Sequence, residues 1–329
     1  MAGWRLICLG TGSLLSPTHR AFPATLLDAS GTSYLFDCGD GTVSLLRLVG
    51  GSQVDVVAVT SVSTQEIAGL LTLAEVQRRS KRKALRVCGP PGLKHALEEL
   101  SILLSSMTVT QLFDIEEPAP GQAVYDDGGK YLEPVQVDVG NASVGYGYLI
   151  YEYPLPGRVD AAKARCLGIR GADFAQLQAG QTVHGVRPDD VIGPARRGRR
   201  VVVTGRGRST ESLAKSLEGS DVAVFAAPFM DERLEVAEDK YYLTGWEAAE
   251  LASRARVRMV LLQQLGPYAP VPYQVAEARQ FHERLLAPND GDVVSIPLPE
   301  DGIPGLERGN RRQTERLRRP GQAGQRRGS

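Results

Sequence analysis

Residues 56–70 read VVAVTSVSTQEIAGL, in which an apolar run passes through a short polar turn into the start of a helix. The run Val54–Thr60 is typical of a buried strand, because it is short and mostly valine. From Glu66 to Arg79, apolar residues recur at the spacing of one helix face. This strand–turn–helix unit predicts an α/β architecture.

The same unit recurs on both sides of this stretch. Further strand-like runs are Arg5–Leu9, Thr25–Asp28, Ser33–Phe36, Leu85–Cys88, Arg200–Thr204, Val222–Phe225, Arg258–Gln263 and Asp292–Ile296. Further helical patterns are Gly92–Leu104, Thr210–Leu217, Thr244–Arg254 and Tyr273–Leu286. The alternation predicts a layered fold with sheets inside and helices outside.

Residues 154–199 interrupt this alternation. They are rich in glycine, proline and arginine, and they hold two short helical patterns, Ala161–Cys166 and Ala172–Gln178. We therefore expect a protruding arm inserted into a single domain that spans residues 1–300.

The composition is that of a soluble globular protein. Of the 329 residues, 42% are hydrophobic and 23% are charged. No apolar run approaches the ~18 residues that a membrane span requires, and the N-terminus MAGWRLICLG lacks the pattern of a signal peptide. The four cysteines form no CxxC pair, which favours free thiols. We expect a cytoplasmic protein with no membrane association.

The net charge of zero hides an asymmetry. Residues 308–329 hold eight arginines and one glutamate, so the rest of the chain carries a matching excess of acidic residues. The segment 301–329 has too few apolar residues to order itself, and we expect an arginine-rich disordered tail. Its composition is compatible with a nucleic-acid-binding arm and equally with a solubilising tail.

Four motifs resemble those of one family in order and spacing. They are LGTGSLLSPTHR (9–20), LFDCGDGT (35–42), CGPPGL (88–93) and GYLIYE (147–152). The resemblance is to ribonuclease Z, the tRNA 3′-processing endonuclease family of the metallo-β-lactamase superfamily, and it covers residues 5–297. It implies the metallo-β-lactamase fold, a four-layer αββα sandwich, with a dizinc site. In that family the arm clamps the tRNA elbow.

At the family's metal-site positions the resemblance places other residue types. The positions are Ser61, Ser63, Gln65, Glu66, Asn141, Arg206, Tyr242 and Gln264. Hydroxyls and amides are poor zinc ligands, and a fixed guanidinium repels a cation. We therefore interpret these positions as vestigial, and we assign no catalytic residue, no metal ligand and no cofactor. Arg206 either pairs with Glu66 to fill the vacated space or offers its forked donors to an RNA phosphate.

Two functions follow from these observations. The first is a pseudoenzyme of the ribonuclease Z family that binds tRNA or another RNA, or acts as a partner subunit in tRNA 3′ processing. It would form a homodimer, or a heterodimer with an active ribonuclease Z-like subunit. The alternative is an active metal-dependent tRNA 3′ endonuclease or phosphodiesterase with an unusual metal site, rebuilt around His19, Asp37, Asp40 and Glu66. The candidate RNA contacts are Arg196, Arg197, Arg199 and Arg200. The sequence does not identify the RNA or the partner.

Overall fold

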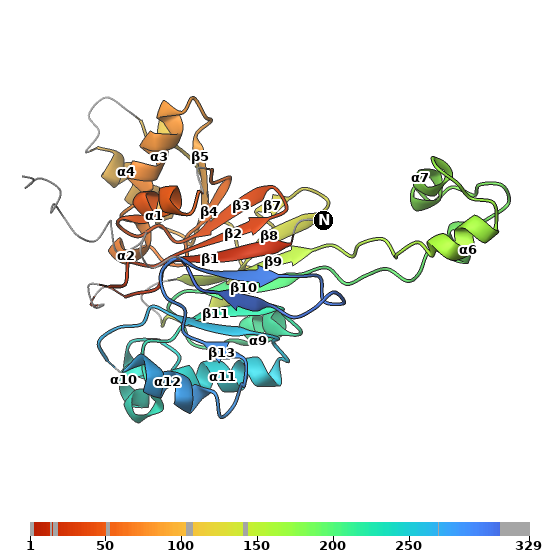
Figure 1. Cartoon of the computed structure of the whole chain (residues 1–329). Helices are drawn as coiled ribbons and strands as arrows, with labels where there is room; N and C mark the ends of the chain where they lie inside the picture. The colour runs from red at the N-terminus through yellow and green to blue at the C-terminus, as the bar shows by residue number, and fades with distance from the viewer. Residues whose placement is uncertain are drawn as a thin grey trace, which may run out of the picture.

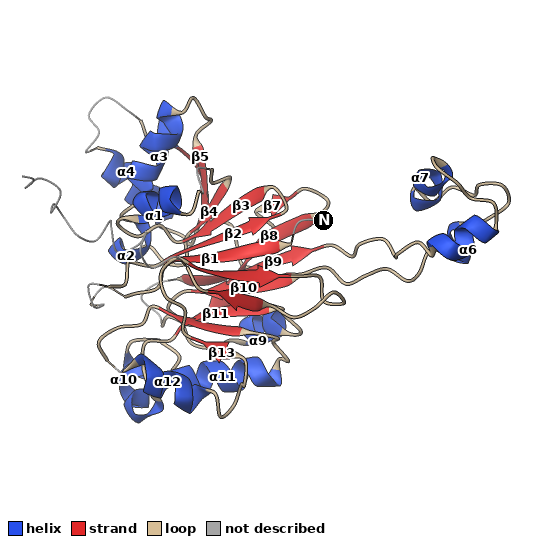
Figure 2. Cartoon of the chain, viewed as in Figure 1, coloured by secondary structure: helices blue, strands red, loops and turns tan. Residues whose placement is uncertain are grey.

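Two β-sheets lie face to face in the middle of the molecule, and helices cover both outer sides (Figure 1 and Figure 2). The computed structural model describes residues 3–13, 15, 19–50, 53–102, 108–140, 144–268 and 270–309. A long arm extends away from one end of the sheets (Figure 1).

The first sheet has eight strands in the order β15-β14-β1-β2-β3-β4-β5-β6. Their bounds are β1 Trp4–Gly10, β2 Ala24–Ala29, β3 Thr32–Phe36, β4 Val56–Ala58, β5 Leu85–Cys88, β6 Phe113–Glu116, β14 Asp292–Ile296 and β15 Gly305–Glu307. Along β1, Leu6 and Cys8 belong to the cluster between the sheets, whereas Ile7 and Leu9 pack with the outer helices. Successive side chains of a strand point to opposite faces, so this sheet is buried on both sides.

The second sheet has seven strands in the order β13-β12-β11-β10-β9-β8-β7. Their bounds are β7 Tyr125–Asp126, β8 Lys130–Val137, β9 Gly145–Glu152, β10 Arg200–Thr204, β11 Val222–Ala226, β12 Val260–Gln263 and β13 Leu285–Leu286. From β10 to β13 the neighbouring strands are parallel, whereas β7, β8, β9 and β10 pair antiparallel. Parallel pairing requires crossover connections, and helices α9 to α12 supply them.

Helices on the first sheet are α1 Thr42–Leu48, α2 Thr64–Ile67, α3 Leu70–Arg79, α4 Leu93–Ser101 and α5 Val109–Leu112. Helices on the second sheet are α9 Glu211–Leu217, α10 Leu234–Asp239, α11 Gly245–Arg254 and α12 Val271–Ala278, with the 3₁₀ turn η1 Asp231–Arg233. Three buried apolar clusters correspond to the spaces between these four layers. The predicted αββα sandwich is therefore confirmed.

The predicted helix Glu66–Arg79 is interrupted at Gly69. The amide of Gly69 donates to the carbonyl of Cys38 (2.8 Å). A side chain at Gly69 would meet the carbonyl oxygen of Gly39 at 2.4 Å. Contact with this distant loop divides the segment into α2 and α3, which the local sequence pattern does not reveal.

The predicted helix Tyr273–Leu286 also ends early, at Ala278. The chain then turns, and Leu285 and Leu286 form β13, which pairs in parallel with β12. The side chain of Arg279 donates to the carbonyl of Leu285 (2.8 Å) and holds this turn. Pairing at the edge of the sheet therefore overrides the helical pattern.

The arm is a narrow two-stranded connection that carries three short helices, α6 Ala161–Cys166, α7 Asp173–Gln178 and α8 Pro188–Val191. Isolated bridges join Leu155 to Arg196 and Val159 to Ile192 along the connection. At its tip a small apolar cluster packs the helices together. The arm thus has its own small core, outside the sandwich (Figure 1).

The boundary of the C-terminal tail differs from the predicted residue 301. Gly305–Glu307 forms β15 on β14, because Leu306 packs against the core between the sheets. Residues 310–329, which hold most of the predicted disordered tail, lie outside the described residues. In the part of the chain that is described, no helix is both long and apolar enough to cross a lipid bilayer.

Candidate functional site

A cavity of about 690 Å³ opens at the ends of the strands, where loops of the two halves of the sandwich meet. Ser63, Thr64 and Gln65 line it from the start of α2, and Arg206 lines it from the loop after β10. The remaining lining residues are Ser13, Leu15, Val139, Pro228, Phe229, Asp239, Lys240, Tyr241, Tyr242 and Tyr268. We call this cavity the cleft.

Contacts of Thr60, which follows β4, join the two halves of the sandwich near the cleft. Asp37 accepts hydrogen bonds from the amide (2.8 Å) and the hydroxyl (3.0 Å) of Thr60. The carbonyl of Thr60 accepts the amide of Tyr146 from the other sheet (2.8 Å). A Cβ on Gly205 would lie 2.1 Å from the Thr60 hydroxyl oxygen, so only glycine permits this approach. These contacts bring the two halves together independently of any ligand.

A hydrogen-bond network centred on Glu66 includes three residues that line the cleft, Ser63, Gln65 and Tyr242. Ser63 donates its hydroxyl to Oε2 of Glu66, and the amide of Gln65 donates to Oε1 (2.6 Å). From the other half of the sandwich, the amide of Gln264 also donates to Oε1 (3.4 Å). The hydroxyl of Tyr242 donates to Oε1 of Gln264 (3.4 Å). Glu66 itself is fully buried. Three of the predicted positions, Ser63, Gln65 and Gln264, therefore donate hydrogen bonds to Glu66, and a fourth, Tyr242, donates to Gln264.

Burial sets the acidities of these groups. Desolvation raises the pKa of Glu66, and hydrogen bonds from Ser63 and Gln65 oppose the shift without cancelling it. Burial also raises the pKa of Asp37, and the negative charge of Glu66 adds to this effect. Burial raises the pKa of Tyr242 to about 12, again with Glu66 contributing. Tyr242 is therefore a protonated donor at neutral pH.

Arg206 shares the cleft with this network but does not join it. We expect Arg206 and Glu66 to pair, but within the described residues no hydrogen bond or ion pair connects the guanidinium to Glu66, so the two do not pair directly. Its positive charge still lowers the pKa of Glu66 from a distance. The reason is geometric: donors from Ser63, Gln65 and Gln264 already occupy the carboxyl of Glu66. The Nε atom of Arg206 is buried and has no hydrogen-bond partner in the described structure.

Two further predicted positions have different outcomes. Ser61 is buried beside Glu66 and contributes a hydrogen bond that lowers the pKa of the Glu66 carboxyl. Asn141 lies outside the described residues. The structure thus brings seven of the eight predicted positions to one place.

The donor set around Glu66 does not fit a pair of zinc ions. Zinc in proteins is held by imidazole, thiolate and carboxylate groups. Here the groups that hydrogen-bond to Glu66 are the hydroxyls of two serines and the amides of two glutamines, and His19 is exposed. Across the described ranges, no three His, Cys, Asp or Glu residues come together as a metal site. Hydrogen bonds alone satisfy the buried carboxyl.

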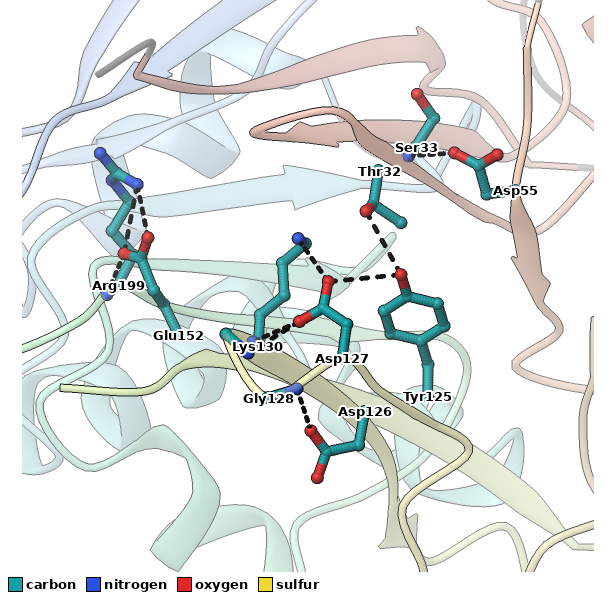
Figure 3. A network of polar contacts seen from close by, with 11 residues as sticks. Thr32, Ser33, Asp55, Tyr125, Asp126, Asp127, Gly128, Lys130, Glu152 and Arg199 are labelled. Atoms are coloured by element: carbon teal, nitrogen blue, oxygen red, sulfur yellow. Dashed lines mark hydrogen bonds and ion pairs between the residues drawn. The ribbon is translucent and has the colours of Figure 1, made fainter. Parts of the chain in front are cut away.

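The candidate RNA contact Arg199 is buried in the fold. Its guanidinium pairs with both carboxylate oxygens of Glu152 (3.0 and 3.1 Å), and its side chain is only 3% exposed. It also lies over the ring of Trp4, 5.5 Å from the centroid. Figure 3 shows the Arg199–Glu152 pair near the turn after β7, where Lys130 pairs with Asp127 (2.8 Å). Its side chain therefore has almost no surface to offer an RNA.

The other three arginines of this segment also have partners in the protein. Arg196 pairs with Glu300 (3.1 Å), and Arg197 pairs with Asp221 (2.7 Å). Arg200 donates to a backbone carbonyl of α9 (3.2 Å) and lies over the ring of Tyr151. These contacts fasten the base of the arm to the sandwich, which is a structural role.

Sequence reasoning identified Tyr242 but missed the other aromatic residues at the cleft, Phe229, Tyr241 and Tyr268. The ring of Phe229 lies 4.8 Å from that of Tyr268 and 5.8 Å from that of Tyr242, measured between centroids. Tyr241 lines the same cavity in a left-handed backbone conformation (φ 55°). The adjacent tyrosines before Thr244, which caps α11, were the available signal.

Comparison with known proteins gives the family. No family model matches the chain. The ribonuclease Z of Halorubrum lacusprofundi is 32% identical over 309 residues, which cover 90% of this chain and 98% of that protein. The ribonuclease Z of Haloferax volcanii is 32% identical over 316 residues, which cover 93% of this chain and 99% of that protein.

Solved structures give the fold. Human tRNase Z, short form, superposes with a TM-score of 0.62 at 17% identity, covering 89% of this chain and 100% of that one. The metallo-β-lactamase fold protein YhfI from Bacillus subtilis superposes with a TM-score of 0.64 at 14% identity, and the match covers 88% of this chain and 98% of that one. Together with the cleft at the strand ends and the sequence identity over almost the whole length of the relatives, these findings show that the chain belongs to the ribonuclease Z family.

Proposed function

We propose that this chain is a non-catalytic member of the ribonuclease Z family, which binds RNA or serves as a partner subunit in tRNA 3′ processing. The observation that carries the proposal is the Glu66 network. Glu66 is fully buried, and its carboxyl accepts hydrogen bonds from Ser63, Gln65 and Gln264. These neighbours are neutral and do not suit a divalent cation.

The chemistry of metal-dependent hydrolysis supports this reading. Such an enzyme needs metal ions to lower the pKa of a bound water and to stabilise charge on the phosphoryl oxygens. In the cleft, Arg206 and Lys240 supply positive charge, but neither generates a hydroxide from water at neutral pH. We therefore assign the cleft to binding and no step of hydrolysis to its residues.

The relatives are named ribonuclease Z and tRNase Z, and a tRNA precursor is therefore the RNA to test. The projecting arm, with its own small core, is a second surface available to an RNA or to another subunit. On this proposal the chain works as a homodimer, or with an active ribonuclease Z-like subunit that supplies the metal site.

The alternative is an active metal-dependent tRNA 3′ endonuclease. One observation favours it: relatives named ribonuclease Z match this chain over 98% or more of their length. This alternative requires metal ligands other than the residues around Glu66.

The test is metal analysis of the full-length purified protein, followed by a cleavage assay on a tRNA precursor with a 3′ trailer. We expect no stoichiometric zinc and no cleavage, with the precursor retained in a gel-shift assay. The ribonuclease Z of Haloferax volcanii, assayed beside it, serves as the positive control. Two zinc ions per chain, or cleavage that a chelator abolishes, contradicts the proposal.

A further inference from the structure

We infer that the cleft is a metal-independent nucleotide site, in which Arg206 binds a phosphate and the tyrosines of the same cavity hold the base. The inference rests on the proposed function, because it names the ligand class of the cleft that we assign to binding. It differs from a dizinc site because the positive charge comes from side chains of the protein and no metal ion is required.

The first support is the state of the Arg206 guanidinium. The side chain is partly buried, its Nε is fully shielded, and within the described residues it makes no hydrogen bond or ion pair. Because this side chain lines the cleft and no protein group accepts its hydrogen bonds, an anionic ligand in the cleft can accept them. Guanidinium presents parallel N–H donors that match two oxygens of a phosphate.

The second support is the aromatic wall of the cleft. Tyr241, Tyr242 and Tyr268 line the same cavity as Arg206, and Phe229 packs behind two of them at 4.8 and 5.8 Å. All three tyrosines are partly exposed, so their rings are available to a ligand. Any of the four bases can stack on an aromatic ring, so this contact does not require a particular nucleotide sequence. The volume of about 690 Å³ is within the range of small-ligand sites.

The third support is the charge of the lining. The charged residues that line the cleft are Arg206, Lys240 and Asp239, an excess of one positive charge among the described residues. Glu66 is not among them, and its carboxyl is covered by its three donors. An anion entering the cleft therefore meets a net positive lining.

A second basic hollow elsewhere on the surface supplies the matched control. It has a volume of about 1000 Å³ and includes Arg82, which is partly buried like Arg206 and whose side chain makes no hydrogen bond or ion pair within the described structure. The hollow lies at the other ends of β4 and β5, away from the cleft. Arg82→Ala therefore removes the same charge without touching the proposed site.

The experiment is isothermal titration calorimetry of the full chain in EDTA with AMP, adenosine, inorganic phosphate and a short single-stranded RNA. We expect AMP and the RNA to bind more tightly than adenosine or phosphate alone, because only they contact both Arg206 and the rings. Preference for the RNA over AMP identifies an RNA end as the source of the nucleotide. Preference for AMP identifies a free nucleotide, and either outcome supports the site.

The variants decide which residues carry the binding. Arg206→Ala is expected to weaken AMP binding by roughly tenfold to a hundredfold, and Arg206→Lys is expected to restore only part of it. Arg82→Ala is expected to leave AMP binding unchanged, and Tyr268→Leu to weaken AMP and adenosine binding together. Melting temperatures of each variant establish that it is folded.

Binding that Arg206→Ala leaves unchanged, or no binding by the wild type, overturns the inference while leaving the proposed function intact. Binding that requires added zinc overturns both. The metal analysis and cleavage assay described above test the proposed function separately.

Discussion

Replacing Glu66 by alanine tests whether the network at the cleft is structural. Glu66 is fully buried, and its carboxyl is the acceptor for Ser63, Gln65 and Gln264. Without it, Ser63 is exposed and turns to water, whereas the amide of Gln264, only 3% exposed, has no replacement acceptor. The change therefore leaves one donor buried and unsatisfied.

The magnitude follows from that donor and from the space left behind. An unsatisfied buried donor costs about 1–3 kcal/mol, and the vacated volume adds about 1 kcal/mol. The expected loss in the free energy of unfolding is thus about 2–4 kcal/mol, which lowers the melting temperature by at least about 4 °C. Thermal unfolding followed by circular dichroism at pH 6, in EDTA, measures it. Glu66→Gln is the control, since it keeps an acceptor for Gln264 and has nearly the same shape.

The opposite result refutes the reasoning. A buried carboxyl kept for catalysis destabilises the fold, and removing it stabilises the protein. A rise in the melting temperature of Glu66→Ala would therefore show that Glu66 is held for chemistry and not for structure. A wild type that EDTA destabilises would show the same, because the network would then depend on a metal.

Three other outcomes are expected from the same structure. The folded-state pKa of Glu66 is raised, so the protonated carboxyl contributes to the stability of the wild type. This contribution is lost as pH rises from the ordinary carboxyl range through the folded-state pKa. The melting temperature of Glu66→Gln minus that of the wild type should therefore increase between about pH 5 and about pH 8. A difference that does not change with pH would contradict this expectation. Glu152→Ala leaves the buried Arg199 without its partner and is expected to lower the free energy of unfolding by about 3–5 kcal/mol in urea, whereas a loss near zero would mean that Arg199 reaches water. Gly205→Ala is expected to destabilise by about 1–3 kcal/mol because its Cβ meets Thr60, and Gly305→Ala, which meets nothing within 4 Å, is the control.

Local sequence patterns predict most strands and the order of the layers. They do so because a short apolar run, as from Leu6 to Leu9, is a property of each strand alone and marks a strand that is buried on both faces. The break at Gly69 is different, since it depends on the carbonyl groups of Cys38 and Gly39 in a distant loop. Nothing within the helical pattern itself encodes that contact.

The candidate site shows the same limit. Motif order predicts which residues gather at the cleft, because the fold fixes where each strand ends. It does not predict which of them pair, because that depends on competition among neighbours. Gln65 and Ser63 are close in sequence to Glu66 and take its oxygens, so Arg206 is left without that partner. Arg199 is a similar case. The run of arginines indicates an exposed basic patch, but Arg199 forms a buried ion pair with Glu152.

If the cleft binds no metal, as we propose, hydrogen bonds between the two halves of the sandwich must hold its shape. In a dizinc protein, metal ions bridge ligands from both halves. Here the amide of Gln264, after β12, reaches Glu66 on α2, and the amide of Tyr146 reaches the carbonyl of Thr60. Both contacts cross from one half to the other through neutral donors. The second does not involve Glu66, so the loss of Glu66 should loosen the cleft without separating the sheets. Arg206 is then free of any structural task, and its donors remain available to a ligand.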